Sequence, residues 1–263
     1  MRGPWLTALR YALIEQARNR LAFGLLLVFV PVWYALLGGL VPSDTLPFRF
    51  RVTGAFLAVN GQDLTLLSAG LNALTLIAGF TLYAATRRGS AFDRRLVLCG
   101  YRQATLLAAK AATLVVVAVT IALYAALVLL LFWRPANFAL VWLGFAGGAL
   151  IYGALGLLLG VLVRSELTGF FLIIMLSLMD TFLQNPYGNP VANKPILQWF
   201  PAYGPTQVAV AGGFTHVAPG RELLTTLAWV LGFALVGLAI FWWRTRAWNA
   251  RGRVAPVAMA PTT

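Results

Sequence analysis

The stretch AATLVVVAVTIALYAALVLLLFW, residues 111–133, contains no Asp, Glu, Lys, Arg or His. A helix needs about 20 apolar residues to cross the hydrocarbon core of a bilayer, where every backbone polar group must be hydrogen-bonded internally. Further windows that meet or approach this requirement are residues 21–41, 64–85, 138–163, 167–183 and 223–243. The sequence therefore predicts an all-α membrane protein with six transmembrane helices within residues 21–246.

The composition of the whole chain is that of a membrane protein. Hydrophobic residues make up 60% of the 263 residues, and charged residues make up only 10%. The formal net charge of +13 would suit a nucleic-acid partner, but a basic soluble domain does not contain such long runs free of ionisable side chains. We therefore expect no nucleic acid as a partner, and we interpret the positive charge as a topology signal.

The distribution of Lys and Arg predicts which side of the membrane each segment faces. If the N-terminus is inside, fifteen of the twenty Lys and Arg residues fall in cytoplasmic segments and five fall in outer segments. Because cytoplasmic loops are enriched in these residues, we expect a multi-pass protein of the cell membrane with both termini in the cytoplasm. Residues 247–263, which are basic and then rich in small residues and proline, are expected to form a disordered tail.

Two segments outside the six windows have patterns of their own. Residues 1–20 place Leu6, Leu9 and Leu13 on one helical face beside Trp5, which predicts an interfacial amphipathic helix; an ordinary extension of the first span is the alternative.

The outer interval 184–221 contains six prolines, which forbid one continuous helix. Its apolar runs predict one or two short re-entrant or interfacial helices, so we expect a re-entrant outer segment before the last span.

The predicted spans contain glycines and uncharged polar residues at positions suited to helix packing. Four-residue spacing places four glycines on one ridge of a helix, where missing side chains let another helix approach closely; lining a substrate path is the alternative. These glycines are Gly144, Gly148, Gly156 and Gly160. Asn72, Thr75 and Ser177 are suited to hydrogen bonds between helices.

Few residues in the sequence have the chemistry of a catalytic or ion-coupling site. The chain has no G-x-x-x-x-G-K-[ST] phosphate loop, no H-E-x-x-H and no G-x-S-x-G. Among Asp, Glu, Lys, Arg and His, the predicted spans contain only Asp180. It lies near the outer end of its window, where we expect its carboxylate to stay hydrated. We therefore expect a protein that is not an enzyme and binds no cofactor itself, with its energy supplied from outside the chain.

The interval ATRRGSAFDRRLVLCGYRQATLLAAK, residues 85–110, holds six of the twenty Lys and Arg residues. As a helix it would have one apolar and one basic face. This interval follows the second predicted span, after an N-terminal amphipathic helix and ahead of a proline-rich outer segment. In the order of these segments along the chain, the protein resembles the permease subunits of type 2 ABC transporters, which export drugs, lipids or polysaccharides. Many members have Glu before the glycine, where this chain has Arg88 before Gly89.

The resemblance implies the membrane subunit of an ATP-driven exporter for a hydrophobic or amphiphilic cargo such as a drug or lipid. Its implied partners are membrane lipid, a second permease half, identical or homologous, and two copies of an ATP-binding-cassette ATPase subunit that carry the ATP and Mg. Segment 86–110 would be the coupling helix that docks on the ATPase, with candidate residues Arg88, Gly89, Ser90, Asp93, Arg94 and Arg95. The alternative role for its arginines is anchoring to lipid phosphates, and the alternative function is a secondary carrier or channel not driven by ATP.

Overall fold

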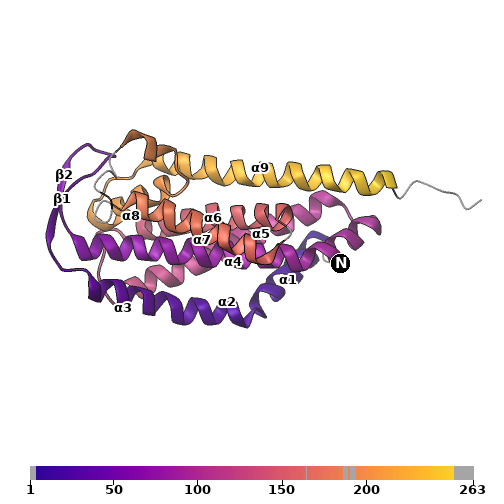
Figure 1. Ribbon diagram of the computed structural model, residues 1–263, viewed down its shortest axis with the longest axis horizontal. Helices are drawn as coiled ribbons and strands as arrows, with labels where there is room; N and C mark the ends of the chain where they lie inside the picture. The colour runs from indigo at the N-terminus through magenta and orange to yellow at the C-terminus, as the bar shows by residue number, and fades with distance from the viewer. Residues whose placement is uncertain (1–3, 164, 186–188, 190–193, 252–263) are drawn as a thin grey trace, which may run out of the picture.

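The computed structural model describes residues 4–163, 165–185, 189 and 194–251. It is an elongated bundle whose main helices run along its long axis (Figure 1). Within the described residues, five helices contain a stretch long and apolar enough to cross a membrane: α4 (Gly61–Leu98), α5 (Gln103–Leu129), α6 (Phe138–Leu162), α7 (Glu166–Gln184) and α9 (Gly220–Arg251). The fold is therefore that of a predominantly helical, multi-pass membrane protein.

The first predicted span is built from three helical pieces. It runs through α2 (Arg20–Gly24), the π-helix η1 (Leu25–Phe29) and α3 (Val30–Leu40), and its apolar part is shorter than the five long helices. Pro31 near the start of α3 has no N–H and leaves the carbonyl of Leu27 without its usual helical donor. The Tyr124 hydroxyl of α5 donates to that carbonyl at 3.2 Å. A neighbouring helix thus satisfies the backbone group that the proline frees.

The centre of the bundle is α6, most of whose residues are buried. It packs against α4, α5, α8 (Tyr203–Phe214) and α9. Fully buried aromatic side chains fill the space around it, among them Tyr34 of α3, Tyr83 of α4 and Phe145 of α6. In contrast, α7 and α9 keep apolar side chains exposed along much of their length, as expected of helices that face lipid or another subunit.

A β-hairpin in the first predicted outer segment is an addition to the expected all-α fold. Strands β1 (Thr45–Arg49) and β2 (Phe56–Asn60) pair antiparallel, with Thr45 opposite Asn60. Gly54 in the connecting turn has φ of +71°, a value that residues with a Cβ rarely adopt. We call this end of the bundle the hairpin end (Figure 1).

The interval 184–221 contains two short helices. The 3₁₀ helix η2 (Pro195–Trp199) leads into α8, whose residues from Tyr203 to Gly213 are all buried. Residues 186–188 and 190–193 of this interval lie outside the described part of the chain. Because α8 packs against α4, α6 and α9, its backbone is enclosed by protein, the condition under which a short helix at membrane depth is tolerated.

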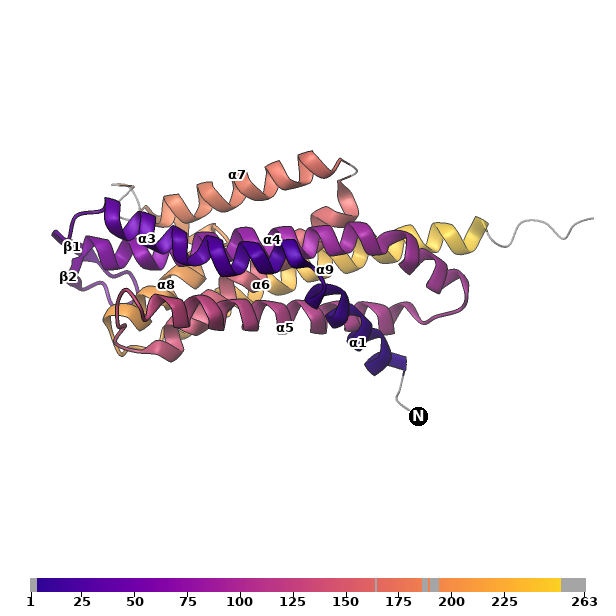
Figure 2. The ribbon, with the colours of Figure 1, turned by 90° about the horizontal axis from the view of Figure 1, so that it is seen from below.

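The two described ends of the chain lie at the end of the bundle opposite the hairpin, which we call the basic end (Figures 1 and 2). Helix α1 (Pro4–Ala17) leaves the bundle at an angle and packs against α5, with Leu9 and Leu13 half-buried and Leu6 exposed. At the other terminus α9 continues to Arg251. Residues 247–251 of the predicted disordered tail are thus helical in the structure, and residues 252–263 lie outside the described part.

Candidate functional site

The predicted coupling segment is the last part of α4 together with a tight turn. Residues 85–98 are not a helix of their own, because α4 continues without a break to Leu98. The chain then reverses through residues 99–102 into α5, and Gly100 in this reversal has φ of +86°. The end of α4 bends toward the start of α5 at the basic end (Figure 2). The segment is thus continuous with a spanning helix.

The six candidate coupling residues differ in how far they are accessible. Arg88, Ser90 and Arg95 are exposed, while Gly89 is half-buried. Asp93 is turned inward, with 8% of its surface exposed. The side chain of Arg94 lies outside the described part of the structure. The exposed members of the set thus present positive charge at the end of the bundle.

Three polar contacts tie this part of α4 to the rest of the bundle. Asp93 forms an ion pair with Lys110 of α5. The Arg87 guanidinium donates to the carbonyl of Val163, the C-cap of α6, at 3.0 Å. The Tyr83 hydroxyl donates to the carbonyl of Ser165, which caps α7, at 3.0 Å. Any displacement of the end of α4 therefore acts directly on α5 and on the α6–α7 connection.

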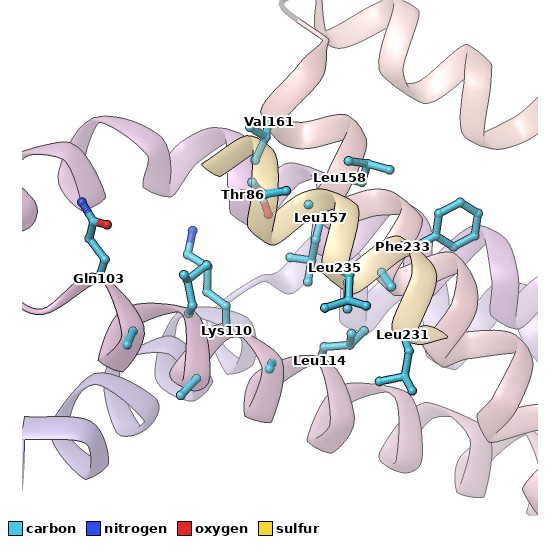
Figure 3. A pocket seen from close by; sticks show the side chains of 18 residues that line it. Thr86, Gln103, Lys110, Leu114, Leu157, Leu158, Val161, Leu231, Phe233 and Leu235 are labelled. Atoms are coloured by element: carbon cyan, nitrogen blue, oxygen red, sulfur yellow. The ribbon is translucent and has the colours of Figure 1, made fainter. Parts of the chain in front are cut away.

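Two cavities adjoin these contacts. One, of about 580 Å³, lies between α1, the end of α4 and the start of α5, and its polar lining includes Glu15, Asp93 and Lys110. The other is an apolar groove of about 990 Å³ between α5, α6 and α9. Figure 3 shows Leu114 and Phe233 along this groove and Lys110 toward one end of it. The Lys110 ammonium group that borders this apolar space is the one that pairs with Asp93.

The four ridge glycines of α6 lie at close approaches to neighbouring helices. A methyl group built on Gly156 would collide with the carbonyl oxygen of Gly79 in α4, and one on Gly160 would lie 2.7 Å from the Thr86 Cβ. One built on Gly148 would meet Leu71 of α4, and one on Gly144 would meet the backbone of α8. None of the four lines either cavity just described.

Asp180 is not hydrated at an interface, as the sequence suggested, but is buried with 3% of its surface exposed. Its Oδ2 accepts a hydrogen bond from the Tyr152 hydroxyl of α6 at 2.8 Å and another from the backbone N–H of Ala202 at 2.7 Å. Ala202 is the residue that caps α8. The burial of Asp180 was not predictable from its own window, because the segment that covers it lies some twenty residues further along the chain.

A network of uncharged polar groups lies on the same face of α7. The Asn72 amide of α4 donates to the Thr181 hydroxyl at 3.0 Å, and the Thr75 and Ser177 hydroxyls are 2.6 Å apart. Ser177, Asp180 and Thr181 share this face because residues three and four apart are neighbours on a helix. The prediction that Asn72, Thr75 and Ser177 join helices by hydrogen bonds is confirmed.

No protein-family model and no curated protein matches the chain. Among the described residues there is also no group of three or more His, Cys, Asp and Glu side chains that could hold a metal ion. The functional interpretation therefore depends on two regions, the predicted coupling segment at the basic end and the buried cluster around Asp180.

Proposed function

We propose that the chain is the transmembrane permease subunit of an ATP-driven exporter of the type 2 ABC class. ATP would be hydrolysed by a separate ATPase subunit, which docks on the end of α4 and the α4–α5 turn. The observation that carries the proposal is that exposed Arg88 and Arg95 project from the end of a spanning helix which is itself anchored to α5 and α6. Such an element transmits force from a docked partner into the bundle.

The proposal includes six membrane crossings, a re-entrant η2–α8 segment and cytoplasmic termini. Residues 20–40 are helical throughout, and about 21 residues at 1.5 Å each give roughly 31 Å, enough for a sixth crossing. Both ends of the described chain lie at the basic end (Figure 1), which fits an even number of crossings. The α4–α5 turn and α1 lie at that same end (Figure 2), as docking on one cytoplasmic partner requires.

The cargo of this exporter is a hydrophobic or amphiphilic molecule. The groove between α5, α6 and α9 is lined almost entirely by apolar side chains, with Gln103 and Lys110 as its long polar side chains. Two permease halves, identical or homologous, would complete the transport path between them. The exposed apolar faces of α7 and α9 provide surface for such an association and for contact with lipid.

The coupling surface can be tested by charge reversal in the complex of the permease with its cognate ATPase. We expect Arg88→Glu and Arg95→Glu to abolish most of the cargo-stimulated ATP hydrolysis and to weaken co-purification of the ATPase, because both side chains are exposed where the partner docks. Arg49→Glu is the matched control, since Arg49 is exposed on β1 at the hairpin end. Full stimulation in both coupling variants would refute the docking role.

A secondary carrier is the second candidate function, and the burial of Asp180 favours it. Intramembrane carboxyl groups mark ion or proton pathways in carriers driven by an ion gradient. Transport by vesicles that contain the permease alone, with a proton gradient and without ATPase, would support this function. Transport that requires both the ATPase and ATP would support the exporter.

A further inference from the structure

The Asp180 carboxyl group is shared by three elements at the side of the bundle away from the coupling segment. It lies on α7, its Oδ2 accepts hydrogen bonds from Tyr152 of α6 and from Ala202 at the start of α8, and its Oδ1 is buried without a hydrogen-bond partner. The Gln184 side chain also lies near the carboxyl group, but its amide donates to the Leu197 carbonyl at 3.0 Å. Two hydrogen bonds therefore reach Oδ2 and none reaches Oδ1. The cluster plays no part in the proposed docking of an ATPase.

No positive charge compensates a carboxylate at this position. Among the described residues no Lys, Arg or His pairs with Asp180. From α4 the facing polar groups, Asn72 and Thr75, are not ionisable. Arg51 of the hairpin faces the Tyr203 ring at 5.4 Å rather than Asp180. The side chains that act on Asp180 from its surroundings are Tyr152 and Gln184. Arg51, Glu222 and Arg221 act on Tyr203 instead.

We propose that Asp180 is a proton-binding site, whose carboxyl group is held in the folded protein as a neutral acid with the proton on Oδ1. A charge without a counter-ion in an apolar interior costs far more free energy than a neutral polar group does. A carboxyl group in that position therefore binds a proton and becomes neutral. The inference does not depend on whether the protein is an exporter.

A proton fits the geometry better than a metal cation does. Sodium, calcium and magnesium ions require several oxygen ligands around them. At Asp180 the Oδ2 atom faces two hydrogen-bond donors, Tyr152 and the Ala202 N–H, which would be repelled by a cation. A proton needs only one oxygen, and Oδ1 has no hydrogen-bond partner.

Protonation makes the junction of α6, α7 and α8 sensitive to pH. The folded state retains a proton at Asp180 that the unfolded, solvated side chain releases at neutral pH, so stability falls as the pH rises. Asn is nearly isosteric with the neutral acid and its amide oxygen can accept the same two hydrogen bonds. Asp180→Asn should therefore fold at neutral pH and lose the part of the pH dependence that is due to this site.

The direct test is infrared spectroscopy of the full chain reconstituted in lipid nanodiscs at pH 7, in H₂O and D₂O. We expect the C=O stretching band of a protonated carboxyl group, shifted on deuteration, in the wild-type protein and in Asp44→Asn, whose altered side chain is exposed. The band should be missing in Asp180→Asn. Absence of the band from the wild-type protein would overturn the proposal whether or not the variants fold.

Two further measurements challenge the same proposal. When sodium replaces choline as the cation of the buffer, the infrared band should stay unchanged. Loss of the band in sodium buffer would show that a metal cation takes the place of the proton. The melting temperature of the wild-type protein should fall more steeply between pH 6 and pH 9 than that of Asp180→Asn, and equal slopes would contradict a proton bound at this residue.

Discussion

Replacement of Gly156 by alanine tests the packing of α6 on α4 most directly. The added methyl group would collide with the Gly79 carbonyl oxygen and lie 3.1–3.2 Å from the Gly79 carbonyl carbon and Cα. These are backbone atoms of a helix, so no rotamer change relieves the contact and the two helices must separate. Overpacking of this kind costs about 1–3 kcal/mol, and the better helix propensity of alanine returns about 1 kcal/mol. Because the contact is with backbone atoms, the cost lies at the upper end of that range, about 3 kcal/mol. We therefore expect a net destabilisation of about 2 kcal/mol.

The measurement is unfolding of Gly156→Ala in mixed micelles, followed by circular dichroism as denaturing detergent is added. Gly232→Ala is the matched control, because Gly232 also lies inside a helix but a methyl group there meets nothing within 4 Å. The control should be as stable as the wild-type protein or more so. If Gly156→Ala were equally stable, the close contact between α4 and α6 would be refuted.

Three other perturbations have defined outcomes. Cys99 is the only cysteine and is exposed in the α4–α5 turn, so a membrane-impermeant maleimide should label inside-out but not right-side-out vesicles, and bound ATPase should slow the labelling. Tyr124→Phe removes the donor to the Leu27 carbonyl and should cost about 0.5–1.5 kcal/mol in the same unfolding assay. Arg51→Ala removes the contact with Tyr203 and the hydrogen bond to the Lys194 carbonyl, so hydrogen exchange should become faster in the β-hairpin and unchanged in α5.

The spanning helices were predictable because each apolar window is a local property of the sequence. Residues 111–133, 138–163 and 223–243 all fall within or largely within long helices of the structure. The hairpin was missed because its strands are only five residues long and lie in a segment defined as an outer loop. The limits of α4 and α9 were underestimated, since charged residues such as Arg87 and Arg246 end an apolar window without ending a helix.

The candidate coupling segment could be delimited in the sequence as a basic interval between two apolar windows, but its internal contacts were not predictable. The ion pair between Asp93 and Lys110 depends on the reversal at Gly100, which brings residues seventeen apart in sequence together. The Arg87 contact with Val163 joins residues 76 apart. Periodicity assigns a residue to a face of its own helix, but it does not identify the residue that another helix brings to that face.

Asp180 shows why distance from the end of an apolar window is a poor measure of hydration. The carboxyl group lies one turn from the end of α7, a position from which an isolated helix would expose it to water. In the folded chain η2 and α8 return over this end, and Ala202 donates a backbone hydrogen bond that water would otherwise supply. The six prolines of residues 184–221 rule out a continuous helix, and the two short helices found there cover the site. The segment that looks least regular in the sequence thus determines the chemistry of the one acidic residue within the apolar part of α7.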